Sequence, residues 1–338
     1  MILAGIDEAG YGPTLGPLVI SVSVFRIPEP ASAESAEELP DLWKLLEPAV
    51  CRKPDGRRVP INDSKKLFSQ KKGPCALEEG LLPFFCLPER RFPRDLRSFL
   101  RGVVSRQSVT GDSEVADAYL DRYPWYRERN VKLPVETFEN VVRRRAVSLT
   151  AALEAAGIEH VGLGARPLEV LEFNRGIASF ENKARVSFDA IASFLRRLWL
   201  RFPDQSVDVV VDRQGGRTRY APLLFEYIRP QGVCIDEQSE ELSVYRLRRR
   251  SRNGPSKRFR VTFASESETR HLPVALASML SKYLREMHMI LFNQFWRELR
   301  EDLKPTAGYA LDARRFLTDI QPLRQRLQID DALLVRRR

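Results

Sequence analysis

Two adjacent acids, Asp7 and Glu8, lie where the first apolar run of the chain ends. The run covers residues 2–6, and the acids lead into the glycine- and proline-rich stretch GYGPTLG. Such a run predicts a buried strand, and carboxylates at a strand end beside a flexible turn are well placed to hold a metal ion. Side chains alternate along a strand, so both acids can serve one site only where the strand ends or is distorted. The glycines of the turn permit such a distortion.

The same glycines superficially resemble the phosphate-cradling loop of a dinucleotide-binding fold. That fold requires a helix directly after the loop. Here residues 18–25, LVISVSVF, alternate β-branched residues and predict a second strand. We therefore expect a hairpin with a wide glycine turn. Two solvated acids at a strand end would be the simplest alternative if this segment stood alone.

Further motifs follow along the chain. Residues 62–67 read NDSKKL, and residues 207–212 read VDVVVD. The second motif is an apolar run that predicts a central strand, and a neighbouring strand could bring its final carboxylate, Asp212, beside Asp7. An alanine-rich helix is predicted over residues 273–287, and Gly308 and Tyr309 follow it.

Taken together, DEAGYGP and NDSKKL resemble the type 2 ribonucleases H, the ribonuclease HII family. That family has a third acid at the end of an apolar strand, a fourth shortly before an alanine-rich helix, and a late Gly-Tyr pair. Asp212 matches the third acid, and the spacing back from the helix places Glu268 at the fourth. The resemblance covers residues 1–28, 61–85, about 158–212 and about 262–322.

The resemblance implies an α/β fold of the ribonuclease H-like type, with a mixed five-stranded sheet flanked by helices. It implies a metal-dependent endoribonuclease that hydrolyses the RNA strand of RNA/DNA hybrids, or single ribonucleotides embedded in duplex DNA. Two divalent ions can activate water and stabilise the leaving oxygen. Asp7 would bridge two ions, Mg²⁺ or Mn²⁺, and Glu8, Asp212 and Glu268 would complete their shells. Hard oxygen ligands suit these ions, and no histidine or cysteine cluster suggests zinc.

Substrate-binding residues are also implied by the resemblance. A 2′-hydroxyl distinguishes a ribonucleotide from a deoxyribonucleotide. In the family the backbone of the Gly-x-Gly loop and the late tyrosine read it, and Gly10, Tyr11, Gly12 and Tyr309 occupy those positions. Taken alone, Tyr309 would be interpreted as an ordinary half-buried tyrosine. Three further residues match motif positions near substrate phosphates: Lys65, Ser278 and Lys282.

The sequence departs from the family pattern near the proposed site. Tyr11 stands where the family usually has arginine or lysine, Glu268 replaces an aspartate, and Ala310 replaces a proline. These departures keep open a related nuclease that acts on structured DNA. A non-hydrolytic nucleic-acid-binding protein of the same fold is the other alternative, and the retention of all four carboxylates argues against it.

An arginine-rich segment lies between the third and fourth acids. Residues 243–265 contain two β-capable stretches around Asn-Gly-Pro and predict a basic hairpin. We favour a phosphate-tracking role, with Arg248, Arg249 and Arg250 as a nucleic-acid patch. The alternative is a solvated ribbon whose arginines pair with nearby acids such as Glu237.

Composition agrees with a nucleic-acid enzyme. The chain has 338 residues, with 55 Lys and Arg against 45 Asp and Glu, which gives a formal charge of +10 and favours a polyanionic partner. The four cysteines show no CxxC spacing and indicate a reducing compartment. Met1 leads directly into the first strand, which leaves no room for a signal peptide, and no apolar run has membrane-spanning length. We expect a soluble cytoplasmic monomer without a membrane partner.

Interruptions of the family pattern suggest the domain organisation. We expect a catalytic domain over residues 1–85 and 158–338, with an inserted loop at 28–60. A helical subdomain is expected at 86–157, with helices near 93–104, 113–123 and 134–156. A strand is expected near 160–173, followed by one long amphipathic helix over 177–200.

Overall fold

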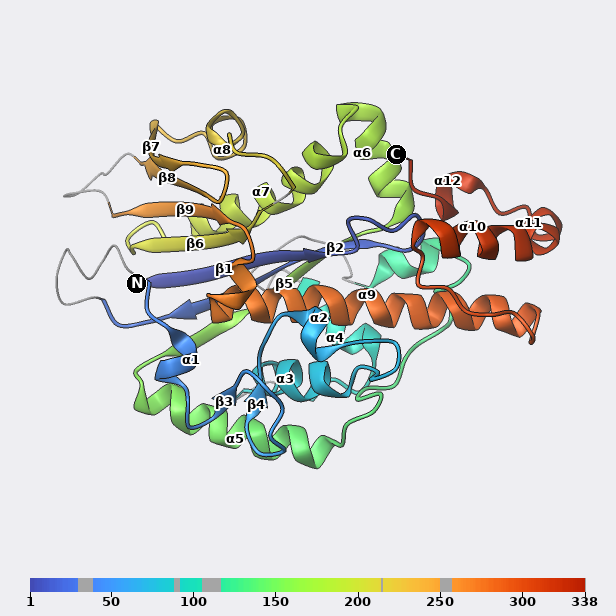
Figure 1. Ribbon diagram of the computed structural model, residues 1–338, viewed down its shortest axis with the longest axis horizontal. Coiled ribbons are helices and arrows are strands. Elements are labelled where there is room, and N and C mark those ends of the chain that lie inside the picture. Colours follow the sequence, from blue (N-terminus) through green and yellow to red (C-terminus); the bar gives the residue numbers. More distant parts are fainter. Residues whose placement is uncertain (30–38, 88–91, 105–116, 214, 250–256, 338) are drawn as a thin grey trace.

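A seven-stranded mixed sheet runs through the middle of the molecule (Figure 1). The computed structural model describes residues 1–29, 39–87, 92–104, 117–213, 215–249 and 257–337. The order of the strands across the sheet is β5-β2-β1-β6-β9-β8-β7. Their bounds are Ile2–Ala9 for β1, Leu18–Arg26 for β2, Glu159–Leu168 for β5, Val207–Asp212 for β6, Gly232–Gln238 for β7, Leu242–Arg248 for β8 and Phe259–Ala264 for β9.

The strand directions confirm the α/β class and the mixed sheet. β1 is antiparallel to β2, as the predicted hairpin requires, and parallel to β6, which is parallel to β9. No helix follows the glycine loop, so the dinucleotide-binding interpretation is wrong. The sheet has seven strands instead of the expected five, because β8 and β7 extend it beyond β9. The predicted basic hairpin corresponds to β8 and β9, which pair from Leu242 opposite Ala264 to Leu247 opposite Phe259.

Helices cover both faces of the sheet, because β1 is apolar on both sides. Leu3 belongs to a core shared with the long helix α9, whereas Ile2, Ala4 and Ile6 belong to a second core shared with α7. The α9 side holds α3 (Cys75–Phe85), α4 (Leu96–Val104), α5 (Glu139–Ala155) and α9 (Leu272–Leu299). The other side holds α6 (Val170–Phe180), α7 (Lys183–Arg201) and α8 (Ala221–Ile228).

Short elements complete the chain. A two-stranded sheet of β3 (Val50–Cys51) and β4 (Val59–Pro60) lies in the 28–60 segment, near α1 (Leu42–Leu45). Near the carboxylates lie α2 (Ser64–Leu67) and the 3-10 turn η2 (Ser267–Thr269). After α9 come α10 (Ala310–Asp319), α11 (Gln321–Leu327) and α12 (Asp331–Leu334), which gather beside the end of α9 (Figure 1). None of the helices within the described ranges is long and apolar enough to cross a membrane.

The start of α9 packs directly on the middle of β1. A Cβ atom at Gly5 would lie only 2.2 Å from the backbone of Pro273 and Val274, so a side chain at Gly5 cannot be accommodated without a shift. Ser23 on β2 donates a hydrogen bond to the Pro273 carbonyl at 2.6 Å. This contact fixes the first turns of α9 beneath the end of β1 that carries Asp7.

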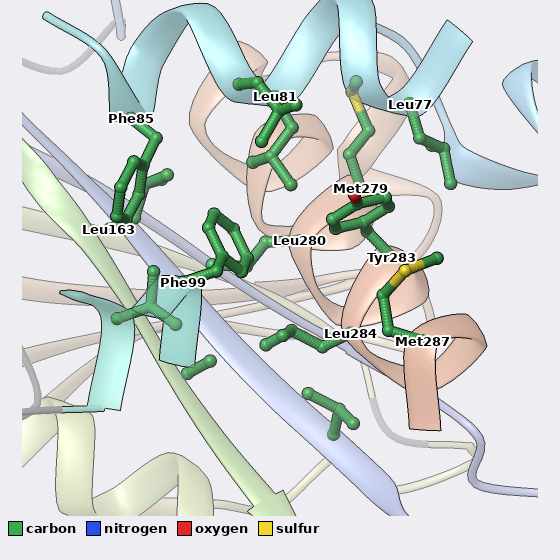
Figure 2. Packing of buried hydrophobic residues seen from close by; sticks show 14 of the residues in the cluster. Leu77, Leu81, Phe85, Phe99, Leu163, Met279, Leu280, Tyr283, Leu284 and Met287 are labelled. Carbon is green, nitrogen blue, oxygen red and sulfur yellow. The ribbon is translucent and has the colours of Figure 1, made fainter. Parts of the chain in front are cut away.

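The described part of residues 86–157 shares its core with α9. Figure 2 shows Phe99 of α4 beside Leu280 and Tyr283 of α9, and the Phe99 and Tyr283 rings meet edge to face at 5.8 Å. Trp125 meets Phe292 of α9 in the same way at 5.3 Å. The division of the chain at 86 and 157 stays a prediction, whereas the packing joins these elements to α9.

Three secondary-structure expectations are corrected. The predicted helix over 177–200 is wrong at its start, because α6 ends at Phe180 and α7 begins at Lys183. Glu181 adopts a left-handed conformation with φ of 50°, and Asn182 then caps α7 by accepting a hydrogen bond from the Arg185 amide. The strand predicted near 160–173 ends at Leu168. Of the helix predicted over 113–123, the described part is a 3-10 turn, η1 (Ala118–Arg122).

Candidate active site

Three of the four predicted carboxylates meet at one end of three adjacent strands. Ile6 of β1 pairs with Val211 of β6, so the next residues, Asp7 and Asp212, lie side by side. Asp212 in turn pairs with Ala264, the last residue of β9. Glu268 lies in η2, a few residues after that strand end. The parallel pairing of β1 and β6 therefore brings Asp7 and Asp212 together, as the sequence predicted, and η2 places Glu268 beside them.

The turn η2 is fixed to the end of β6 through Asp212. The amide and hydroxyl of Ser267 both donate hydrogen bonds to Asp212 Oδ1, at 3.1 and 3.0 Å. Arg52, from the 28–60 insertion, donates to the Thr269 carbonyl at 2.7 Å. Glu268 thus lies between Ser267, which is hydrogen-bonded to β6, and Thr269, which is hydrogen-bonded to Arg52.

Burial and mutual repulsion disfavour the charged forms of these acids. Asp7 is 8% and Glu268 7% exposed. Burial, followed by the charge of Asp212, raises the pKa of Asp7 well above its usual value. The same two causes raise the pKa of Glu268 to about 7, and burial raises the pKa of Asp212. A bound cation would favour the charged forms and offset the repulsion among these acids.

Glu8 lies on the opposite face of the sheet. β1 stays paired with β2 as far as Ala9, so its side chains keep alternating. Glu8 accepts a hydrogen bond from Ser187 of α7 at 3.3 Å, whereas Asp7 lies on the side of α9. The strand distortion that would turn both acids to one side is absent from this part of β1. The charge of Glu8 nevertheless raises the pKa of Asp212.

The carboxylate oxygens of the site suit a hard divalent cation, although the side chains are not arranged as a complete set of metal ligands. Within the residues that the structure describes, no three His, Cys, Asp or Glu side chains form a ready metal-binding group. Glu268 Oε2 is buried and has no hydrogen-bond partner among the residues that the structure describes, which leaves it able to serve as a ligand. Carboxylate oxygens are the donors that Mg²⁺ and Mn²⁺ prefer. The site thus fits such ions in charge and in donor type.

The glycine loop touches the late Gly-Tyr pair. Gly10 and Gly308 have positive φ values of 88° and 83°, which favour glycine. The Thr14 amide donates to the Gly308 carbonyl at 2.7 Å. Arg285, buried on α9, donates to the carbonyls of Pro17 and Ala307 at 2.8 and 2.9 Å. Two motifs almost 300 residues apart in the sequence are thus adjacent in space.

The two tyrosines implied in ribose recognition differ in exposure. Tyr309 caps the start of α10 and is 55% exposed, more than the half-buried residue expected from sequence alone. Tyr11 is partly buried, and the Lys183 Nζ atom lies 4.4 Å from the centre of its ring. Gly12 is exposed, and an added Cβ there would meet nothing within 4 Å.

The residues assigned to substrate phosphates are placed unequally. Ser278 is buried, shares a 3.1 Å hydrogen bond with Ser64, and lowers the pKa of Asp7 through a side-chain hydrogen bond. Lys65 is exposed on α2. Lys282 forms an ion pair with Glu286 at 2.6 Å and lies over the Phe68 ring. Lys65 is therefore open to a ligand, whereas Lys282 already has an acidic partner.

The arginine patch lies at the other end of the sheet from the acids. Leu242 is the β8 residue level with the carboxylate end, and Arg248 lies six residues further, about 20 Å along an extended strand. Arg249 packs on the Trp199 ring at 4.1 Å and donates to the Phe202 carbonyl. Burial lowers the pKa of Arg249. Arg248 is exposed, and Arg250 lies outside the described residues.

Sequence reasoning did not single out several residues that shape the site. Asp63 caps α2, and its charge contributes to the raised pKa of Glu268. Asp63 lies within the NDSKKL motif, so an acidic residue there could have been predicted as part of the site. Ser267 had no signal, because its role depends on the turn η2. Arg285 did offer one: a charged residue within a long apolar helix is unusual unless it is paired or hydrogen-bonded.

Comparisons with known proteins place ribonucleases H among the similar structures. The sequence matches no protein-family model and no curated protein. A Pyrococcus horikoshii ribonuclease H2 structure shares 15% identity at a TM-score of 0.42, over 99% of this chain and 92% of that one. An Archaeoglobus fulgidus ribonuclease HII in complex with PCNA shares 14% identity at a TM-score of 0.39, over 100% and 95%.

A ribonuclease HIII, designated Bst and solved with Mn²⁺, shares 13% identity at a TM-score of 0.37, over 99% of this chain and 66% of that one.

Proposed function

We propose that the protein is a metal-dependent endoribonuclease. Its substrate would be the RNA strand of RNA/DNA hybrids, or single ribonucleotides embedded in duplex DNA. The observation that supports this most is the meeting of Asp7, Asp212 and Glu268 at one sheet end, where burial and the neighbouring acids raise their pKa values. Repulsion between buried carboxylates destabilises the folded state, and binding of a divalent cation would offset that repulsion.

Some residues of the site would bind the metal ions, and others would contact the substrate. Asp7, Asp212 and Glu268 would hold divalent ions, and Glu8 would join them from the other face of β1. Such ions supply an activated water and stabilise the leaving oxygen of a phosphodiester. The glycine loop and Tyr309 would contact the ribose, because the Thr14 to Gly308 hydrogen bond keeps them together. The exposed Lys65 would contact a phosphate beside the site.

One assay tests this function directly. Purified protein is incubated with duplex DNA containing one ribonucleotide, with an RNA/DNA hybrid, with all-DNA duplex and with branched all-DNA, each with Mg²⁺, Mn²⁺ or chelator. We expect cleavage of a ribonucleotide-containing substrate, and its loss with chelator. Cleavage of branched but not ribonucleotide-containing DNA would support the structured-DNA alternative.

A non-hydrolytic nucleic-acid-binding protein remains the second candidate. Glu8 faces α7, and the described acids form no ready three-ligand group. Both features are what a site that has lost catalysis would show. Tight binding of the same duplexes, with no product in any metal, would favour this candidate over the nuclease.

Tyr309→Ala should reduce the preference for ribonucleotides more than it reduces duplex affinity. The side chain is exposed, the neighbouring Gly308 is hydrogen-bonded to the glycine loop, and a positioning contact acts mainly on the transition state. The measurement is the ratio of kcat/KM values for single-ribonucleotide and all-DNA duplexes, together with duplex Kd. The exposed Leu311, two residues further on, supplies a matched control as Leu311→Ala. If selectivity survives while binding and cleavage fall together, Tyr309 is only structural.

Replacing Arg248 and Arg250 with glutamine should weaken binding to all duplexes alike. Each lost phosphate contact should flatten the plot of log Kobs against log salt by about 0.9. Arg249 is kept, because its stacking on Trp199 makes it part of the fold. Arg143 and Arg144, exposed on α5 away from β8, give a control of equal charge change. Equal slopes in both double variants would show that the hairpin is a solvated surface.

A further inference from the structure

A segment after α11 is anchored against α6 and the glycine loop. It consists of α12 and residues 335–337. Asn174 of α6 donates through its side-chain amide to the carbonyls of Ala332 and Val335, at 3.1 and 2.9 Å. The Arg337 amide donates back to the Asn174 side-chain oxygen at 2.8 Å. These contacts set where the intervening residue, Arg336, can reach.

Arg336 binds both ends of the glycine loop. It is 4% exposed. Its guanidinium donates to the Gly10 carbonyl at 2.5 Å and to the Gly16 carbonyl at 2.8 and 2.5 Å. Its own amide donates to the Thr14 carbonyl at 3.0 Å. The rigid fork of an arginine can hold several acceptors in one fixed arrangement.

The environment of Arg336 shows that its charge is costly to bury. Burial lowers the pKa of Arg336 to about 9, and the like charge of Arg285 acts in the same direction. Glu169, itself 3% exposed, is the acid that opposes this effect. An apolar side chain would fill the same space without this cost, so simple packing does not explain an arginine here.

Holding the Gly10 carbonyl fixes the direction of the next amide. A trans peptide plane points its C=O and N–H groups in opposite directions. Because Arg336 draws the Gly10 carbonyl towards itself, the Tyr11 N–H points away from Arg336. That N–H donates to no acceptor among the described residues. It is therefore an oriented, open donor in the loop that follows Asp7 and Glu8.

We infer that Arg336 is a positioning residue that sets the glycine loop to read the ribose of the substrate. It acts through the Gly10 and Gly16 carbonyls and orients the Tyr11 N–H towards a 2′-hydroxyl. Arg285 likewise positions the segment that contains Gly308, through its hydrogen bond to the Ala307 carbonyl. The inference rests on the proposed function, because it assigns selectivity to the same site.

The test compares Arg336→Ala and Arg336→Lys with Arg337→Ala, whose side chain is exposed at the next position. Arg336→Ala should lower kcat on a single-ribonucleotide duplex about a hundredfold, as a misplaced catalytic contact does, with duplex Kd unchanged. The selectivity ratio over all-DNA duplex should fall as well. Millimolar guanidinium should restore part of kcat to Arg336→Ala and none to Arg337→Ala.

Amide hydrogen exchange of residues 10–17 provides a readout that does not need activity. Exchange should accelerate in Arg336→Ala, and less in Arg336→Lys, which keeps the charge but loses the fork. If Arg336→Ala does not fold, Arg336→Lys carries the test. Wild-type exchange and wild-type selectivity in the folded variants would overturn the inference. If the wild-type protein cleaves no duplex, the proposed function fails, while faster exchange would still establish that Arg336 orders the loop.

Discussion

Asp7→Asn and Asp212→Asn should each remove nearly all cleavage while the protein stays folded. Both carboxylates lie at the meeting point of β1 and β6, and each would contribute directly to the ion shells. Neutralising either one lowers the negative charge of the site and its affinity for a divalent cation. The measurement is the single-turnover cleavage rate in saturating Mn²⁺. A rate close to wild type in either variant would show that the two-metal assignment is wrong.

The same substitutions should stabilise the metal-free protein. Burial and the charge of Asp212 raise the pKa of Asp7 above its unfolded value, so the folded state keeps a proton that the unfolded state releases. Stability is therefore lost as pH rises through the interval between the two pKa values, and the loss is complete above the folded one. Asp7→Asn removes this loss.

In chelator at pH 8, Asp7→Asn should raise the Tm by roughly 1–2 °C for each kcal/mol of repulsion relieved, because the entropy of unfolding grows with chain length. The increase should shrink towards pH 4, where the wild-type carboxyl keeps its proton. Asp204→Asn, at an exposed position, provides the control and should change the Tm little at either pH. A Tm below wild type at pH 8 would mean that the charge of Asp7 is already compensated in the fold.

The sequence predicted the parts of the site that depend on local pattern. The apolar runs before Asp7 and Asp212 become adjacent parallel strands, and this places both acids together. The glycine stretch forms the turn of the predicted hairpin. These successes share a cause, because strand periodicity and strand ends are encoded by neighbouring residues.

The parts that could not be predicted depend on tertiary contacts. The role of Arg249 is decided by Trp199, about 50 residues earlier, and the side on which Glu8 lies is decided by how far β1 stays regular. The outermost strand, β7, depends on pairing with β8, which its charged sequence GVCIDEQ does not favour. The contact of Arg336 with Gly10 joins opposite ends of the described chain and has no local signal.

Glu268 and Glu266 compete for the fourth acidic position, and the structure separates them. The two would share a face only if this stretch were an extended strand. It is a 3-10 turn instead, in which Glu266 has a left-handed φ of 52° and an exposed side chain, whereas Glu268 is buried beside Asp212. Glu268 therefore faces the other acids, and Glu266 faces solvent.

Glu268→Gln should strongly impair cleavage, and Glu266→Gln should leave it close to wild type. Glu268 is one methylene longer than the aspartate that the family pattern has, which moves its oxygens by about 1 Å, and Mg²⁺ tolerates such a displacement poorly. The wild-type protein should therefore be more active with Mn²⁺ than with Mg²⁺. Glu268→Asp should keep activity and shift the preference towards Mg²⁺.

Cleavage rates with each metal, measured for the same substitutions at both positions, decide between the two acids. Thermal shifts caused by Mn²⁺ give a second readout, and they should be lost in Glu268→Gln and kept in Glu266→Gln. Because Glu266 lies two residues away and carries the same charge, Glu266→Gln also controls for a general loss of negative potential. An inactive Glu266→Gln beside an active Glu268→Gln would overturn the assignment of Glu268, and would require η2 to rearrange around the metal.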